Sequence, residues 1–334
     1  MRLAKGFTLT DSLGHNARVE QQRKWLVANP SFLNGASTRA ARYIHFVAQR
    51  LEERGLPAEL ALLPIVESGY NPMANSNRDA VGLWQFIPST GLDFNLRQTR
   101  WYDGRRDILA SSKAAMDYLT RLYELFDNDW LLALAAYNAG EGRVGRAVKW
   151  NRDRGLPTDF WHLRLPEETQ DYVPRLLALS LLVRAPKIHG VKLQPVANEA
   201  YFKIVKLTHA VNLSTFAVDA GIDESELLRL NPAFLTKQMI DGPAHLLVPR
   251  TLTTPLPSVS TQELSPDLTS YAVLQKPRKR PPSQQLRPPI QAPVPQVPNQ
   301  QVAVPPQRKP IIVYSDSHTP EMTRPRAFIP RRWL

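Results

Sequence analysis

The chain has 334 residues, of which 43% are hydrophobic, an ordinary share for a globular protein with a buried core. Its formal net charge is +12, and it contains no cysteine, which excludes disulfides, thiolate metal ligands and cysteine nucleophiles. No run of residues comes near the roughly 18 apolar positions of a transmembrane helix, so none is predicted.

Residues 1–56 are predicted to form a helical arm that packs on the domain after it. The pattern predicts one helix over residues 19–28, which ends at Asn29 before a proline. A second helix is expected over residues 37–54, because apolar side chains recur there at i, i+3 and i+4 and Gly55 follows. The first residues lack an apolar core segment, so no secretory signal is predicted in this sequence.

Residues 57–190 are predicted to form an all-helical domain. A helix over residues 58–67 is expected to begin after Pro57 and to be kinked by Pro64, just before Glu67. The period-3.6 pattern predicts further helices over residues 111–126, 130–138, 144–151 and 166–184.

The pattern changes between residues 200 and 250. Apolar and polar residues alternate over 201–205, as in a strand, and a second strand is expected over 245–249. Two short helices, over 213–220 and 224–230, are predicted between these strands. The result is a small βααβ unit, and the fold class is mainly α.

Residues 251–334 are predicted to be a disordered, Pro-rich tail, because they hold 17 prolines and show no periodicity. They also carry 11 Lys and Arg against 4 Asp and Glu, so most of the basic excess belongs to the tail. The sequence pI near 10.0 suggests a nucleic-acid-binding protein, but aromatic residues do not interleave with this charge. Contact with an anionic cell-wall polymer or a membrane surface is expected instead, with no nucleic-acid partner.

Glu67 is the candidate catalytic residue. It stands at the end of an apolar helix and is followed by a polar loop. Apolar surroundings disfavour the ionised form of a carboxyl, so its pKa is expected to rise toward the working pH of a general acid. The alternative is a helix-terminal carboxylate without a chemical role.

Three further polar clusters follow Glu67. Trp84 and Phe86 flank Gln85, which suits either a core or a surface that stacks on a sugar ring. Tyr137 and Asn138 end a very apolar helix, so they line a cavity or form a buried Tyr and a helix cap. The last cluster is Glu168 and Tyr172, which share a helix face at i, i+4 spacing, either in the site or in solvent.

Together these clusters resemble the family 1 lytic transglycosylases, whose soluble-transglycosylase-like fold is related to goose-type lysozyme. The chain has the family's motifs in order: E-S at 67–68, N-P-x-A-x-S at 71–76, G-L-W-Q-F-x-P at 82–88, A-Y-N-A-G at 136–140 and E-T-x-x-Y-V at 168–173. Residues 101–107 and the appended small unit are most similar to the membrane-bound lytic transglycosylase D branch.

The resemblance implies a lysozyme-like catalytic domain over residues 57–190, with Glu67 as the only catalytic acid and base. Ser76 and Gln85 would contact the sugar next to the scissile bond. Tyr137 would form a hydrogen bond near Glu67 and help to hold its proton. The groove would be lined by Asn138, Glu168 and Tyr172.

The implied reaction is non-hydrolytic cleavage of the MurNAc-β-1,4-GlcNAc bond of peptidoglycan, which leaves 1,6-anhydroMurNAc ends. Glycosidases ordinarily use two carboxylates, and the sequence offers only Glu67 in a shaped motif. One group therefore acts as acid and then as base, without cofactor or metal. Two alternatives stay open: a hydrolytic muramidase of lysozyme type, and a murein-binding protein without activity.

The small unit resembles a LysM peptidoglycan-binding module, but residues 207–213 replace the usual opening Gly-Asp-Thr-Leu. It is therefore expected either to bind glycan or to be a structural remnant that packs on the catalytic domain. The family resemblance implies a bacterial cell-envelope protein, periplasmic and associated with the outer membrane, that acts on glycan strands as a monomer.

Overall fold

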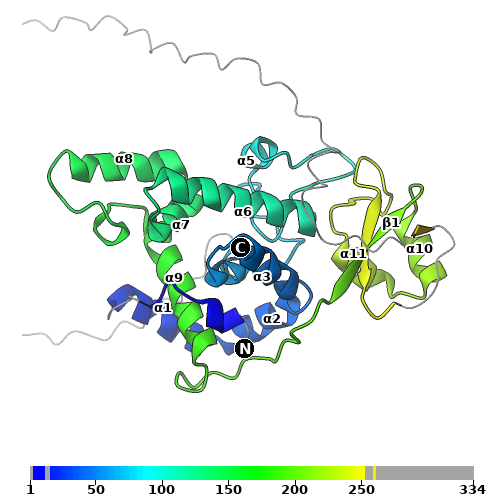
Figure 1. Ribbon diagram of the computed structural model, residues 1–334, viewed down its shortest axis with the longest axis horizontal. Coiled ribbons are helices and arrows are strands. Elements are labelled where there is room, and N and C mark those ends of the chain that lie inside the picture. Colours follow the sequence, from blue (N-terminus) through cyan, green and yellow to red (C-terminus); the bar gives the residue numbers. More distant parts are fainter. Residues whose placement is uncertain (1–2, 12–15, 253–258, 261–334) are drawn as a thin grey trace, which may run out of the picture. The chain divides into compact units, whose positions relative to one another are not determined.

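The structure is a computed structural model that describes residues 3–11, 16–252 and 259–260. These residues belong to one compact unit and are mainly helical, as Figure 1 shows. Within these ranges, every helix is too short or too polar to cross a membrane.

Three helices form the N-terminal arm: α1 (Ala17–Ala28), α2 (Pro30–Ala40) and α3 (Ile44–Glu53). Asn16 caps α1, because its side-chain oxygen accepts hydrogen bonds from the first free backbone N–H groups. A short 3-10 helix, η1 (Leu3–Gly6), precedes them.

The single helix expected over residues 37–54 is wrong, because the chain turns at residues 41–43 between α2 and α3. The turn brings the ring of Tyr43 inward, where it stacks on Tyr70 with centroids 6.4 Å apart. It also directs Arg42 toward the small unit. These distant contacts override the local helix preference.

The expected helix over residues 58–67 is also two elements, the 3-10 helix η2 (Ala58–Leu62) and α4 (Leu63–Ser68). Pro64 lies in the first turn of α4, where a missing N–H leaves no hydrogen bond unmade. It therefore starts a helix instead of kinking one. Gly69 ends α4 in the left-handed conformation, with φ of 56°.

The remaining helices of this part are α5 (Pro88–Asp93), α6 (Ile108–Leu125), α7 (Trp130–Ala139), α8 (Glu141–Arg152), η3 (Phe160–His162) and α9 (Glu167–Arg184). Four of them, α6 to α9, agree with the predicted ones within a few residues, whereas α5 and η3 were not predicted. Asp107 and Asp129 cap α6 and α7 with their carboxylates.

The core of the helical part forms around α9. This helix packs against α1, α4 and α7, and in Figure 1 it lies between α1 and α7. Leu176, Leu177 and Leu182 on it have no exposed surface. The C-terminal half of α9 is therefore held by packing, which fixes where its first turns meet α4 and α7.

The small unit, residues 201–252, has the predicted βααβ order. Its elements are β1 (Phe202–Leu207), α10 (Leu213–Ala220), α11 (Glu224–Leu230) and β2 (His245–Pro249). The two strands are antiparallel, with Phe202 opposite Pro249 and Lys206 opposite His245. A second hydrophobic cluster, which includes Leu213, Leu227 and Leu246, lies inside this unit.

A third strand, β3 (Val259–Ser260), pairs antiparallel with β1 at the edge opposite β2. Its two residues lie in the range predicted to be disordered, so that prediction fails for them. Apart from residues 251–252, the rest of the predicted tail lies outside the described residues.

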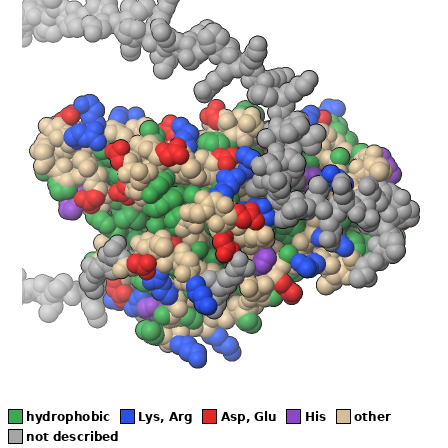
Figure 2. All heavy atoms as spheres, viewed as in Figure 1, with side chains coloured by type: hydrophobic (Ala, Val, Ile, Leu, Met, Phe, Trp, Pro, Cys, Tyr) green, Lys and Arg blue, Asp and Glu red, His purple; other side chains and the backbone are tan. Residues whose placement is uncertain are grey.

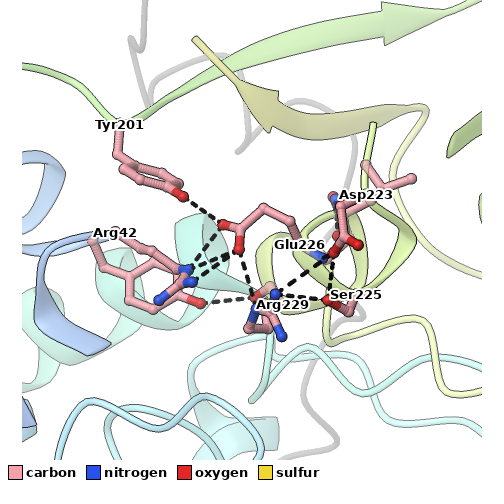
Figure 3. A network of polar contacts seen from close by, with 9 residues as sticks. Arg42, Tyr201, Asp223, Ser225, Glu226 and Arg229 are labelled. Atoms are coloured by element: carbon pink, nitrogen blue, oxygen red, sulfur yellow. Dashed lines mark hydrogen bonds and ion pairs between the residues drawn. The ribbon is translucent and has the colours of Figure 1, made fainter. Parts of the chain in front are cut away.

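An ion-pair network joins the small unit to the N-terminal arm, as Figure 3 shows. The guanidinium of Arg42 forms a two-pronged contact with Glu226, at 2.8 Å from Nε to Oε1 and 2.9 Å from Nη2 to Oε2. Tyr201 donates its hydroxyl to the same carboxylate at 2.8 Å. Next to it, the hydroxyl of Tyr43 donates to the backbone carbonyl of Arg229.

A second contact joins the small unit to the loop before α6. The N–H of Leu235 donates to the carbonyl of Trp101 at 2.9 Å, and the N–H of Asp103 donates to the carbonyl of Ala233 at 3.0 Å. Between these bonds, the rings of Tyr102 and Phe234 pack with centroids 5.5 Å apart. The small unit is thus held to the helical part at two separate places.

Candidate active site

Glu67 lies in the last turn of α4 and is 2% exposed. The helix end that carries it is fixed from two sides. The hydroxyl of Ser68 donates to the carbonyl of Leu83 at 2.9 Å, and Nε of Arg39 donates to the carbonyl of Gly69 at 2.7 Å. A six-residue helix gains little stability alone, so these tertiary contacts position the carboxyl.

Tyr172 contacts the carboxyl of Glu67. Its hydroxyl, on the first half of α9, donates a hydrogen bond to Oε1 of Glu67. The sequence assigned this residue to the groove lining and gave the contact near Glu67 to Tyr137. The O–H of Tyr137 donates to the backbone carbonyl of Trp84, the residue before Gln85, at 2.9 Å.

Ser76 lies in the loop after α4 and is 6% exposed. Its oxygen accepts hydrogen bonds from the N–H groups of Arg78 at 3.2 Å and Ala80 at 3.0 Å. These bonds shape the turn and leave the proton of the hydroxyl for donation. A serine in this arrangement suits contact with an acceptor oxygen of a ligand.

Gln85 has a left-handed backbone, with φ of 50°, and is 8% exposed. Its side-chain Nε2 donates to the carbonyl of Gly82 at 2.9 Å, which fixes the amide plane. The neighbouring aromatic rings belong to the core: Trp84 has no exposed surface and donates to Ser112, and Phe86 is 3% exposed. Of the two interpretations of these rings, the core one is correct.

Asn138 and Glu168 lie on facing helix ends, at the last turn of α7 and the first turn of α9. Both side chains are half-buried. The hydroxyl of Thr169 donates to Oδ1 of Asn138 at 2.8 Å and so joins the two helices. Sequence reasoning did not single out Thr169, although it belongs to the same motif.

Arg105 is a second residue that the sequence analysis missed. It is 9% exposed, and its guanidinium donates to the carbonyl of Asp79 at 2.8 Å, in the loop that carries Ser76. The available signal was the run of opposite charges over residues 101–107. That signal indicates a polar loop but does not show which backbone carbonyls the Arg105 side chain contacts.

Of the two carboxyls in the site motifs, that of Glu67 is buried and that of Glu168 is half-buried. The side chains of Asp79 and Asp93, the nearest acidic residues after the motif, are exposed. Across the described ranges, no group of three or more His, Asp or Glu side chains could hold a metal ion. On the face shown in Figure 2, Lys and Arg side chains are interspersed with Asp and Glu.

Comparisons with known proteins find similarity over much of the chain. Residues 45–157 match the family model described as the transglycosylase SLT domain. Membrane-bound lytic murein transglycosylase D of Escherichia coli (strain K12) is 42% identical over 73% of this chain and 54% of its own length. A protein of Alteromonas sp. (strain M-1) named for tributyltin chloride resistance is 37% identical over 45% of this chain and 72% of its own.

Among solved structures, an inactive mutant of lytic transglycosylase Slt from Pseudomonas aeruginosa matches 45% of this chain and 25% of its own. The sequence identity is 24% and the TM-score 0.32, a similarity from which we infer nothing. The chain spans about half the length of the Escherichia coli relative.

Proposed function

Because this chain belongs to the transglycosylase SLT family, we propose that it is a peptidoglycan lytic transglycosylase that uses Glu67 as its only acid and base. One observation carries the proposal. Glu67, the glutamate of the family's E-S motif, is buried, and the hydroxyl of Tyr172 donates a hydrogen bond to its carboxyl.

The first step is proton transfer from Glu67 to O4 of N-acetylglucosamine as the bond from C1 of N-acetylmuramic acid to O4 breaks. Burial supports this role, because removal from water penalises the charged form of a carboxyl. The substrate's own N-acetyl group stabilises C1 in place of a second carboxylate.

In the second step the 6-hydroxyl of the muramoyl residue attacks C1 and transfers its proton to Glu67. The bond between C1 and O6 forms, the carboxyl recovers its proton, and no water is consumed. The product is a 1,6-anhydroMurNAc end. The same group serves as acid and then as base, which general acid–base catalysis allows when its geometry is fixed.

The single buried carboxyl favours this mechanism over a hydrolytic one. Retaining and inverting glycosidases hold two carboxyl groups roughly 5 to 10 Å apart around the bond they cut. Asp79 and Asp93, the nearest acidic residues after the motif, are exposed instead of buried beside Glu67. A muramidase of lysozyme type stays the alternative, as does a murein-binding protein without activity.

We also propose the substrate contacts that the motifs imply. Ser76 and Gln85 bind the sugar next to the scissile bond, because both are fixed by backbone contacts and retain polar atoms for a ligand. The groove continues past Tyr137, Asn138 and Glu168. Tyr172 orients the carboxyl of Glu67.

The domain boundaries of the sequence analysis stand as part of the proposal: an arm over 1–56, a lysozyme-like catalytic domain over 57–190, a degenerate LysM-like unit over 200–250 and a Pro-rich tail over 251–334. We propose a cell-envelope location, periplasmic and at the outer membrane, which the membrane-bound Escherichia coli relative supports. Peptidoglycan strands are the proposed partner of a monomer, with the tail near anionic wall polymer or membrane.

Digestion of purified peptidoglycan, followed by mass analysis of the products, tests the function. Wild type should release muropeptides with anhydro ends, one water lighter than reducing ends. Glu67→Gln should reduce turnover by about 10²- to 10⁴-fold, the usual contribution of a general acid. Glu59→Gln, a matched change of another fully buried carboxyl, should leave turnover intact.

The other outcomes assign the alternatives. Reducing ends in place of anhydro ends would identify a muramidase. Binding to peptidoglycan without turnover by wild type would identify a silent binding protein.

A further inference from the structure

The loop that carries Ser76 and Gln85 has an unfavourable backbone at two places. Asp79 and Gln85 adopt left-handed conformations, with φ of 58° and 50°, although neither is glycine. Such conformations persist only where the surroundings hold them. The loop therefore needs a clamp from outside its own sequence.

Arg105 contacts one of these residues and the neighbour of the other. Its Nη1 donates to the carbonyl of Asp79 at 2.8 Å and lies 3.4 Å from the carbonyl of Phe86, the residue after Gln85. The backbone of Arg105 also lies close to the backbone of Gly82, whose φ is +85°. A Cβ on Gly82 would lie 2.1 Å from the carbonyl oxygen of Arg105.

The direction of the Arg105 side chain is set by Asp103, which is 7% exposed. The two form a bidentate pair, with 3.0 Å from Nε to Oδ1 and 2.8 Å from Nη2 to Oδ2. Nε and Nη2 of the guanidinium thus bind Asp103, and Nη1 donates to the loop. A planar fork of donors can do this, and a lysine ammonium cannot.

The position of Asp103 in turn depends on the small unit. Its N–H bonds to the carbonyl of Ala233, and the preceding Tyr102 packs on Phe234. Gly242 closes this contact, because a Cβ there would lie 2.3 Å from the ring of Phe234. A continuous set of contacts therefore runs from the small unit to the loop.

We propose that Arg105 is a positioning residue for the loop that carries Ser76 and Gln85, and that the small unit holds it through Asp103. The proposal rests on the glycan-binding role proposed for those two side chains. Without the clamp, the loop would have to be ordered by the glycan itself, so binding would weaken. Glu67 is held through α4 and Tyr172, so the chemical step should change less.

The test variant is Arg105→Lys, which keeps the charge and loses the fork. On soluble glycan strands it should raise KM by about tenfold, as expected for the loss of a charged hydrogen bond, and leave kcat nearly unchanged. The matched control is Arg50→Lys, because Arg50 is 5% exposed and pairs with Glu53 within α3. This control should change neither constant.

Amide hydrogen exchange gives a readout that does not require turnover. Exchange over residues 76–86 should accelerate in Arg105→Lys and in Phe234→Ala, whereas exchange over 63–69 should stay at the wild-type rate. Affinity for glycan strands, measured in the Glu67→Gln background, should fall by the same factor by which KM rises.

The outcomes separate the two proposals. Lack of turnover by wild type would count against the lytic activity only, because exchange and affinity would still test the clamp. Unchanged exchange over 76–86 in Arg105→Lys would overturn the clamp. Faster exchange with unchanged affinity and KM would show a purely structural contact and overturn the positioning role.

Discussion

The hydroxyl of Tyr172 on α9 donates to Oε1 of Glu67 on α4, although the two residues are 105 positions apart in the sequence. Tyr172 is 5% exposed and Glu67 2%, so the bond lies in a region of low dielectric. Hydrogen bonds there are stronger than in water and restrict the rotation of the groups they join. The carboxyl therefore has a fixed direction before any substrate binds.

Removal of this bond should slow the chemical step. In Tyr172→Phe we expect kcat to fall by about 10- to 100-fold with little change in KM, the range set by a hydrogen bond to a charged group. Steady-state kinetics on glycan strands measures both constants. The control is Tyr70→Phe, which loses a buried bond to the carbonyl of Ala61 and should lower stability only. A wild-type kcat in Tyr172→Phe would contradict the role.

Substitution of alanine for two glycines should change the free energy of unfolding in opposite directions. Gly82→Ala forces a Cβ against the carbonyl of Arg105 at a left-handed φ, so the free energy of unfolding should fall by roughly 3 kcal/mol or more. Gly145 lies inside α8 with nothing within 4 Å of such a Cβ. Gly145→Ala should therefore gain about 0.5 to 1 kcal/mol. Urea denaturation measures both, and equal effects would refute the clash.

The junction at Glu226 should weaken in acid. Burial raises the pKa of this carboxyl, but hydrogen bonds from Arg42 and Tyr201 outweigh it and hold the pKa below its ordinary value of 4.5. The stabilisation is thus complete above pH 4.5 and is lost as the pH falls through the lower folded-state value. The protection factors of the amides over residues 201–252, which correct for the intrinsic pH dependence of exchange, should fall in this range.

Glu226→Gln provides the comparison. It removes the titrating group, so the amide protection factors in the small unit should depend less on pH in this variant. The same acid dependence in the variant and in wild type would assign the effect to other groups.

Glu59 should show the opposite pH dependence. It has no exposed surface, and burial raises the pKa of its carboxyl although the N–H of Leu9 donates to it at 2.7 Å. The stabilisation is then present below the ordinary value of 4.5 and is lost as the pH rises through the folded-state value. Glu59→Gln keeps the acceptor oxygen and removes the buried charge.

The melting temperature of Glu59→Gln should therefore exceed that of wild type at neutral pH. The difference should shrink toward about pH 4, where the carboxyl is protonated in both folded and unfolded chains. A difference that grows in acid would contradict the assigned direction.

Local signals predicted three elements of the small unit to the residue. The ranges of α10, α11 and β2 agree with the expected 213–220, 224–230 and 245–249, because caps and breakers define them. Asn212 caps α10 with its side chain, and Gly221 ends it in the left-handed conformation. Such information lies within a few residues of each boundary.

The failures of prediction depend on distant contacts. The break at residues 41–43 accompanies the pairing of Arg42 with Glu226, 184 positions away, which no helical period reveals. The contact of Tyr172 with Glu67 likewise depends on how α9 packs against α4, which no local pattern shows. The expected kink at Pro64 is absent because α4 begins at Leu63, so the proline lies in its first turn.

The junction between Tyr102 and Phe234 has a consequence for how such chains can be recombined. Loss of the small unit would uncover Tyr102, which is 5% exposed, and would leave the Trp101 carbonyl and the Asp103 N–H without their partners. An exchange of this unit between related proteins would have to carry residues 101–105 with it. The shortest segment that can be exchanged without breaking these contacts is therefore not continuous in sequence.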